Sequence, residues 1–287
     1  MRFNEKALAM VSVLGQVSPP RMYSPYRVGF DGVPRVGPAT GGITYNVKVG
    51  DPVYGWAGDH IEPGVSTKNK DNNENAAYNV LACIGNEAKV VSGEAKGATG
   101  TVIGKHGGIE HVMVHFNDET LDQLVVGDKL QIRAFGQGME LLDHPDIKVM
   151  NVSPDLLRAW DIEESGNRIK VPVAAIVPGH LMGSGLGASS AERGDYDITT
   201  QDKDELKEHG LEDLRFGDFV AITDHASHFG RHYKKGAIII GVVVHSDSFI
   251  SGHGPGVTTM LTAYDGLIEP VVNARANVGH YLGLRQL

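Results

Sequence analysis

Glycine fills 37 of the 287 positions in this sequence, nearly twice the share of about 7% in average proteins. The glycines follow no three-residue period, so a collagen-like helix is excluded. Glycine weakens helices but allows tight turns, bulges and close approach between backbones. We therefore expect a mainly β protein with short strands, many tight connections and few short helices.

Composition limits the class of protein further. Hydrophobic residues make up 41% of the chain and charged residues 21%, which is typical of a globular protein with a large core. The net charge of −9 argues against nucleic-acid binding and against binding to anionic membranes. The longest apolar run, 237–244, is too short to span a membrane. Because Cys83 is the single cysteine, we expect a reducing compartment, the cytoplasm.

Strand patterns dominate the chain. An apolar segment at 9–17 and strict alternation of apolar and polar residues at 43–49 both predict strands. The Asn-rich segment 66–79 is interpreted as an exposed loop. Residues 88–116 contain two strands joined by a Gly-Gly turn, and three further strand patterns follow after residue 167. The overall pattern predicts a larger β-sandwich or barrel-like body.

Two short helices are predicted from their end signals. Ser153 precedes Pro154, and this pair is typical of an N-cap followed by the first helical residue. Asp202 is followed three residues later by Glu205, and Gly210 ends the pattern. Both helices would be short connections between strands.

Residues 88–116 resemble the KOW motif of SH3-like barrels. The resemblance rests on one ordered set of residues: Val90, Val91, Gly93, Lys96, Gly97, Gly100 and Val102. It implies a small SH3-like barrel inserted into the larger body. We predict that residues 78–135 form this barrel and that 1–77 and 136–287 form the main β domain. Lysines and glutamates balance in the motif and aromatic residues are scarce, so a structural barrel is favoured over an RNA-binding one.

The whole chain also resembles an uncharacterised bacterial and archaeal family, known as a domain of unknown function. The residues that carry this resemblance are the segments GGITYNVKVGD, GDHIEPGVS and HSDSFISGHGPGV, together with the barrel-like segment. The resemblance implies an all-β body with an inserted barrel. It implies no catalytic residues.

Histidine is the residue type that points to chemistry. The chain has 13 histidines, and five of them fall in one short region: His225, His228, His232, His245 and His253. His245, Asp247 and His253 form the tighter group, because they follow one apolar strand and lie in a glycine-containing segment. Imidazole and carboxylate ligands suit divalent zinc, manganese, iron or nickel. The alternative is that these side chains are hydrogen-bonded and inert.

A second polar group lies in the N-terminal half. Asp59, His60 and Glu62 fall within four residues, between glycines and a proline. His60 is predicted to join His245, Asp247 and His253 as a metal ligand. Asp59 and Glu62, with His245 and Asp247, are predicted to act as catalytic acids or bases. The alternative for this segment is a solvated polar turn.

Three residues are predicted to bind substrate. Asn46 lies in the alternating segment 43–49, where its amide could hydrogen-bond a ligand. His180 and Ser184 belong to a glycine-rich connection whose backbone N–H groups could bind an anion. This connection matches neither the dinucleotide nor the phosphate-loop spacing. Its alternative interpretation is a closely packed link between strands.

Three functions remain open from the sequence. The first is a metal-dependent enzyme, a hydrolase or lyase that acts on a small polar metabolite. The second is a non-catalytic binding module for a carbohydrate, a peptide or RNA. The third is a structural homo-oligomer packed through its glycine-rich loops.

Overall fold

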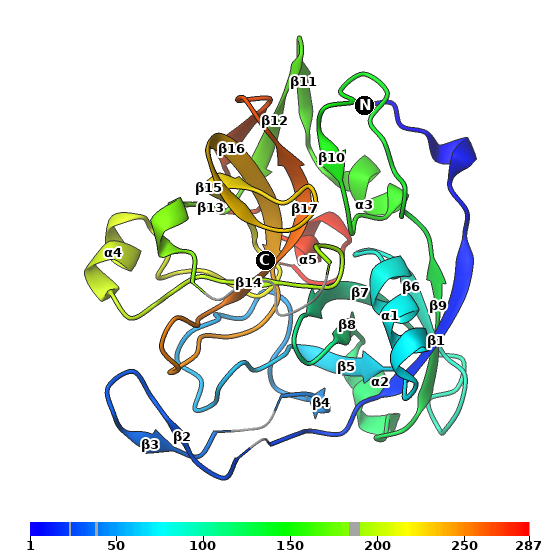
Figure 1. Ribbon diagram of the computed structural model, residues 1–287. Helices are drawn as coiled ribbons and strands as arrows, with labels where there is room; N and C mark the ends of the chain where they lie inside the picture. The colour runs from blue at the N-terminus through cyan, green and yellow to red at the C-terminus, as the bar shows by residue number, and fades with distance from the viewer. Residues whose placement is uncertain (23, 38–39, 184–189, 287) are drawn as a thin grey trace.

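The computed structural model describes residues 1–22, 24–37, 40–183 and 190–286. Within these ranges the mainly β fold with few short helices is confirmed (Figure 1). The helical segments are η1 (Glu5–Ala7), α1 (Asn72–Leu81), α2 (Asp118–Gln123), α3 (Pro154–Ala159), η2 (Gly179–Leu181), α4 (Lys203–Glu208) and α5 (Val278–Tyr281). No helix in the described part of the chain is long and apolar enough to cross a bilayer.

Six strands in the first half of the chain form a closed barrel. In order around the barrel they are β1 (Val11–Val17), β9 (Lys129–Ala134), β6 (Glu87–Val90), β7 (Thr99–His106), β8 (His111–His115) and β5 (Gly64–Lys68). The barrel closes because β5 pairs back onto β1, with Thr67 opposite Val17. The short strand β4 (Ile43–Thr44) adds to the free end of β5. Apolar side chains such as Val102 and Ile132 fill the interior.

The barrel uses more of the chain than the segment 78–135. Four of its strands lie within that segment, but β1 and β5 come from the residues before it. A segment of this length with only four strands cannot close a six-stranded barrel, so the flanking chain completes it. The SH3-like, KOW-type assignment and the division into two independent domains stay predictions.

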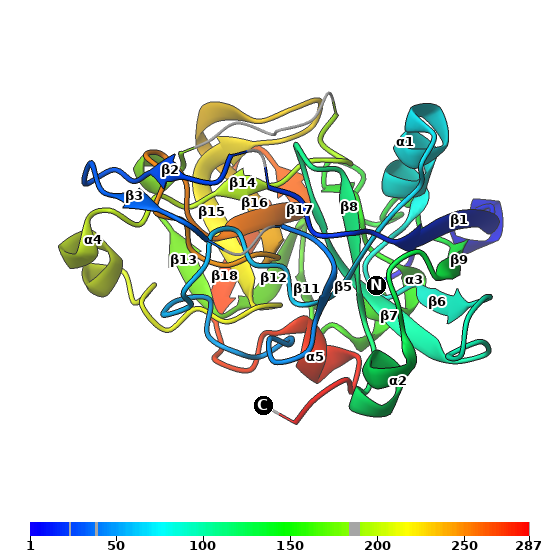
Figure 2. The same cartoon turned by 90° about the horizontal axis from the view of Figure 1, so that it is seen from below.

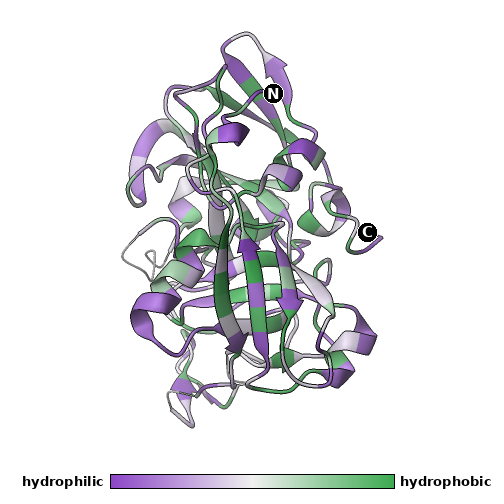
Figure 3. Cartoon of the chain, turned by 90° about the vertical axis from the view of Figure 1, so that its right-hand side faces the viewer, coloured by the Kyte–Doolittle hydropathy of each residue, from purple (hydrophilic) through white to green (hydrophobic). Residues whose placement is uncertain are grey.

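A second sheet forms the body of the C-terminal half. Its strands run in the order β10 (Lys148–Val149), β17 (Gly256–Ala263), β16 (His232–Val243), β15 (Phe219–Ala226) and β13 (Ala175–Val177), and β14 (Tyr196–Asp197) pairs with the start of β17. Strands β15 and β17 are nearly continuous runs of buried residues, and β16 is buried after its first five residues. In Figure 3 hydrophobic residues are concentrated along strands, whereas several helices carry hydrophilic residues. The second sheet is therefore covered on both faces along most of its length.

The remaining strands form two smaller units. A three-stranded sheet contains β11 (Glu163–Ser165), β12 (Arg168–Val173) and β18 (Ile268–Val272), and a hairpin contains β2 (Arg27–Val28) and β3 (Pro34–Arg35). The hairpin projects from the body at the lower left of Figure 1.

The barrel packs against the second sheet through its outer wall. Ile103 and Met113 belong to barrel strands, yet they lie in the core that contains Ile240 of β16. A hydrogen bond also links the two sheets: Thr258 Oγ1 in β17 donates to the backbone carbonyl of Lys105 in β7 at 2.8 Å. The ends of β7 and β17 are thus held side by side.

Two local predictions were wrong. The segment 66–79 is not a loop, because α1 begins at Asn72 after Asp71 accepts hydrogen bonds from two backbone N–H groups of the first turn. The predicted strand 43–49 ends at Thr44, and a turn follows. The alternation there reflects the irregular burial of Val47 and Val49 in two different cores.

Candidate metal centre

Six side chains of the types that bind metals converge near the ends of β7, β14 and β16. They are His60, His106, Asp195, Asp197, His245 and His253. Figure 2 shows β14 and β16 beside β17. His106 is the last residue of β7 and Asp197 the last of β14, whereas His245 follows the end of β16. Because β14 pairs with the start of β17 and β17 adjoins β7, these strand ends place their polar residues together.

His60, Asp197 and His253 form the first cluster. His253 Nδ1 lies 2.6 Å from Asp197 Oδ2, and His60 Nε2 lies 3.2 Å from His253 Nδ1. The third separation, from His60 Nε2 to Asp197 Oδ2, is 3.5 Å. Tetrahedral zinc with bonds of about 2.0–2.1 Å separates its ligand atoms by roughly 3.3 Å. Two of the three separations match this spacing, whereas the 2.6 Å contact between His253 and Asp197 is a hydrogen-bond distance that would lengthen around a metal ion.

His60 is held in this cluster by its backbone and by Asp59. Its φ angle of 53° lies in the left-handed region, which residues other than glycine adopt mainly where the surrounding structure enforces it. Its Nδ1 lies 3.3 Å from Asp59 Oδ2. If Nδ1 carries the proton, Nε2 presents a lone pair to the cluster. This is the usual orientation of a metal-binding histidine backed by a carboxylate.

His106, Asp195 and His245 form the second cluster, and one donor atom of each lies within 4.8 Å of the others. His245 Nδ1 faces the Ser246 carbonyl at 2.9 Å, so Nδ1 donates and Nε2 carries the lone pair in the neutral ring. His245 Nε2 lies 2.8 Å from Asp195 Oδ2. Within the described chain neither of these two buried atoms has a hydrogen-bond partner of acceptable geometry.

The two clusters touch. The imidazole ring of His60 lies 4.7 Å from that of His245 and 5.7 Å from that of His106, measured between ring centres. His106 and His245 are stacked at 4.3 Å. His245 is completely buried, whereas 31% of the His253 side chain is exposed. The clusters form one site that is closed at one end and open to solvent at His253.

Glu62 lies behind the second cluster. Its carboxylate contacts His106 Nδ1 at 2.6 Å and His111 Nδ1 at 2.9 Å, and it accepts a hydrogen bond from Ser66 Oγ. His111 is held at its other nitrogen by Ser18 Oγ, at 3.0 Å. Glu62 therefore orients His106 and is shielded from solvent.

The carboxylates and imidazoles shift one another's pKa values. Burial lowers the pKa of His245, but Asp195 and Asp197 outweigh it and raise that pKa well above its ordinary value. Burial raises the pKa of Asp197, yet contacts with His245, His253 and His60 hold it well below the ordinary range. Burial and the nearby charge of His245 lower the pKa of His106. Positive charge is thus stabilised beside Asp195 and Asp197.

Asp247 does not join His245 and His253. Strand β16 ends at Val243, so the alternation expected to align Asp247 with His245 does not extend to them. The Asp247 carboxylate instead accepts hydrogen bonds from Thr200 Oγ1 and, at 2.8 Å, from the Ser248 backbone N–H. The predicted grouping of Asp247 with His245 and His253 as metal ligands was therefore wrong.

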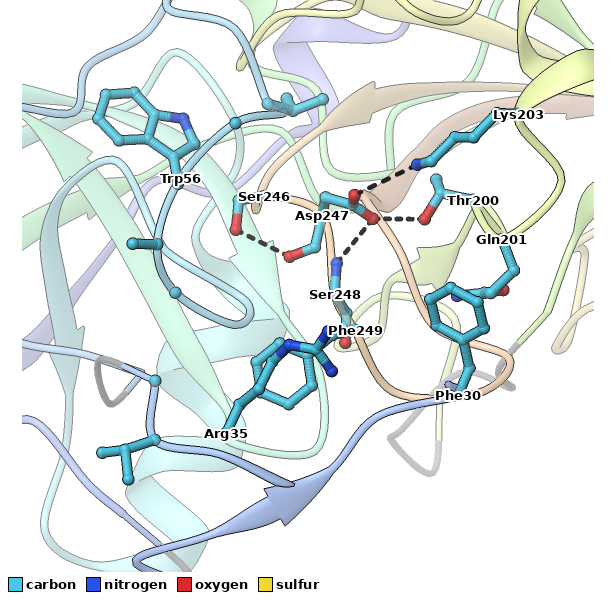
Figure 4. Close-up of a pocket in the computed structure, with 16 residues that line it drawn as sticks. Phe30, Arg35, Trp56, Thr200, Gln201, Lys203, Ser246, Asp247, Ser248 and Phe249 are labelled. Atoms are coloured by element: carbon cyan, nitrogen blue, oxygen red, sulfur yellow. Dashed lines mark hydrogen bonds and ion pairs between the residues drawn. The ribbon is translucent and has the colours of Figure 1, made fainter. Parts of the chain in front are cut away.

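Asp247 lines a cavity of about 500 Å³ beside the first cluster (Figure 4). Ser248 connects the two, because it lines the cavity and its Oγ donates to Asp59 Oδ1 at 2.5 Å. Asp59 in turn accepts from Arg27 at 2.6 Å. The cavity combines aromatic rings with cationic groups: Phe30, Trp56, Phe249, Arg35 and Lys203.

The predicted substrate-binding residues lie elsewhere or cannot be placed. Asn46 is exposed in the turn after β4. His180 belongs to a separate, partly exposed cluster with Glu205 of α4 and His209 at the end of that helix, and its Nε2 lies 3.0 Å from Glu205. Ser184 lies outside the described residues. Asn46 and His180 therefore lie outside the candidate metal centre.

Sequence reasoning missed three of the six converging residues. Asp195 and Asp197 form a D-x-D pattern in the segment RGDYDIT, and His106 precedes the Gly-Gly turn of the barrel. The D-x-D spacing was an available signal, because alternate residues of a strand share one side. His106 was interpreted only as part of a structural barrel.

Comparison with protein families matches two consecutive parts of the chain to two family models. Residues 26–158 match the N-terminal family model of DUF4438, a domain of unknown function, and residues 159–282 match its C-terminal model. The chain belongs to the DUF4438 family. This confirms the predicted membership of an uncharacterised family.

Among solved structures, the DUF4438 chain is similar to the crystal structure of TM1086. The two share 52% sequence identity and a TM-score of 0.94, over 98% of this chain and 99% of that one. No curated protein matched the chain. Its function is therefore argued from the geometry of the site.

Proposed function

We propose that this protein is a divalent-metal enzyme, a hydrolase or lyase that acts on a small polar metabolite. The observation that carries the proposal is the first cluster, in which His60, Asp197 and His253 present three donor atoms 2.6–3.5 Å apart. Catalytic metal sites commonly use three protein ligands, whereas structural sites are closed by four. A divalent ion held in this way keeps a position for water and lowers the pKa of that water.

The donor types support zinc, manganese, iron or nickel. The cluster offers imidazole nitrogen and carboxylate oxygen, and the one cysteine, Cys83, is buried elsewhere. The partial exposure of His253 supports access for a ligand, because a fully closed site would admit no substrate.

The neighbouring cavity supports a small polar substrate. Arg35 and Lys203 supply positive charge, and Phe30 and Trp56 supply apolar surface. Arg35 also forms an ion pair with Asp31 at 2.6 Å, and Lys203 Nζ lies 3.9 Å from Asp247 Oδ2, so part of each charge is already compensated. A molecule with one anionic group and a short carbon skeleton fits this mixture of charge and aromatic surface.

Asp59 and Glu62 are assigned positioning roles in this proposal. Each contacts the outward nitrogen of a candidate ligand, His60 or His106, and each is buried. Carboxylates in this position fix the ring orientation and increase the basicity of the ligand. Catalytic acid–base work by either residue would require direct access to substrate, which their burial disfavours.

The test is metal analysis of protein produced without a histidine tag. We expect a divalent metal to copurify, to be removed by chelation and to be lost in His60→Ala and His253→Ala. His232→Ala is the matched control, because His232 is exposed at the start of β16 and belongs to neither cluster. Protein that neither carries nor takes up a divalent metal would contradict the proposal.

A hydrolysis screen then tests the reaction class. Small carboxylate and phosphate esters and amides are incubated with metal-loaded protein, metal-free protein and the His253→Ala variant. We expect turnover only in the metal-loaded protein. Equal turnover in all three samples would assign the activity to a contaminant. The homo-oligomer and the cytoplasmic location remain predictions.

A further inference from the structure

We propose that the two clusters together form a centre for two metal ions, bridged by Asp197. The inference rests on the proposed function, which places one ion in the first cluster. It adds a second ion in the cluster of His106, Asp195 and His245.

Asp197 is placed to bridge because its two oxygens face different clusters. Oδ2 lies 2.6 Å from His253 Nδ1 and 3.5 Å from His60 Nε2. Oδ1 lies 3.5 Å from His245 Nε2. A carboxylate that binds one ion through each oxygen is compatible with the spacing of about 3.5–4 Å found in two-metal enzymes.

The second cluster contains two electron-pair donors that face each other. Asp195 Oδ1 accepts the Gly107 N–H at 2.7 Å, which leaves Oδ2 free to face the cluster. His245 donates through Nδ1 to a carbonyl, so Nε2 of the neutral ring carries the lone pair, and a bound cation would replace the proton that Asp195 and Asp197 favour there. Both atoms are buried and lack an aligned hydrogen bond, although they lie 2.8 Å apart. A shared cation satisfies both donors, since buried polar atoms are otherwise costly.

Gly256 provides space for this arrangement. A Cβ atom at residue 256 would lie 2.1 Å from Asp195 Oδ2 and 2.2 Å from His245 Nε2. The backbone of Gly256 is not in the left-handed region, so its conformation does not require glycine. Glycine is needed because any side chain would occupy the point where these donor atoms meet.

The charge of the site also favours two ions. Four buried carboxylates lie in or directly behind the clusters, those of Asp59, Glu62, Asp195 and Asp197, and Arg27 is the cation paired with Asp59. With the histidines neutral, a single divalent ion would leave a net negative charge among these buried groups. Two divalent ions with a bridging hydroxide balance it, and uncompensated buried charge is costly.

The experiment measures how many metal ions bind to each chain. Untagged metal-free protein is titrated with Mn²⁺, bound metal is counted by equilibrium dialysis, and electron paramagnetic resonance is recorded. We expect about two ions per chain and the exchange-coupled signal of neighbouring Mn²⁺ ions. His106→Ala and His253→Ala should each lose one ion and the coupling, whereas His232→Ala should keep both. Circular dichroism checks that each variant is folded.

The outcomes separate this inference from the proposed function. One ion per chain, retained in His106→Ala and lost in His253→Ala, would overturn the two-ion centre and leave the metal-enzyme proposal intact. No bound ion would overturn both. Two ions without magnetic coupling, with Asp197→Asn still binding two, would overturn the bridging role of Asp197. Should His106→Ala fail to fold, the ion count and the coupling in the unaltered protein still decide the question.

Discussion

Gly256 lies against two of the candidate ligands, and a single methyl group there tests the second cluster. Gly256→Ala should lower metal content, because its Cβ would lie within 2.2 Å of His245 Nε2 and 2.1 Å of Asp195 Oδ2. Both side chains are buried and have little room to move. Metal analysis checks the result against Gly37→Ala, whose Cβ would meet its neighbours at an ordinary 3.5 Å. Equal metal content in the two variants would show that the site tolerates the added methyl group.

Glu62 gives a second prediction at this scale. Glu62→Gln should weaken metal binding about 10–100-fold, because the amide no longer presents two carboxylate oxygens to His106 and His111. The measurement is competition for Mn²⁺ against a chelator of known affinity. Glu163→Gln is the control, since Glu163 is exposed on β11. Unchanged affinity in Glu62→Gln would remove the positioning role.

The residue types of the site were easier to predict than their grouping. His60, His245 and His253 do lie together, although the first and the last are 193 residues apart in the chain. Asp247 was grouped with them from strand alternation, which fails because β16 ends before it. Asp197 ends β14 and Asp195 directly precedes it, and a strand of two residues carries almost no periodic signal.

At the scale of single elements, helix ends follow local rules and can be tested by one substitution. Ser153→Ala should reduce the free energy of unfolding by about 1 kcal/mol, because Ser153 Oγ accepts the Leu156 backbone N–H at 3.1 Å at the start of α3. Urea denaturation measures the change. Ser165→Ala is the control, because Ser165 is exposed at the end of β11. Equal stability of the two variants would show that the cap contributes nothing.

The same rules explain which elements were predicted. The caps Ser153 and Asp202 were identified from the sequence, and both accept a backbone hydrogen bond. Helix α1 was missed because its many asparagines favour turns in isolation. In the fold, Asp71 caps this helix and Tyr78 packs in the barrel core, which overrides the weak local preference.

At the scale of the whole molecule, the candidate site lies between the barrel and the second sheet. His106 ends the barrel strand β7, whereas Asp197 and His245 belong to the C-terminal half. Barrel closure by β1 and β5 could not be predicted from the segment 78–135, because strand pairing over such distances leaves no local pattern. The mainly β class could be predicted, because glycine and strand patterns are local.

Metal removal should therefore destabilise the entire fold. A ligand that binds only the folded state adds about 2.7 kcal/mol when its concentration is 100-fold above Kd. We expect chelation to lower the Tm of the native protein and to leave that of His253→Ala nearly unchanged. Differential scanning calorimetry with and without chelator measures both. An unaltered Tm of the native protein on chelation would show that metal contributes nothing to stability.

The division of the ligands between the two family domains affects how such proteins can evolve. His60 and His106 lie in the N-terminal domain, and the remaining four lie in the C-terminal one. Neither domain carries a complete donor set for either cluster. Recombination that exchanged one domain for that of a distant relative would separate ligands that have adapted to each other, so the two domains are expected to be inherited as a pair.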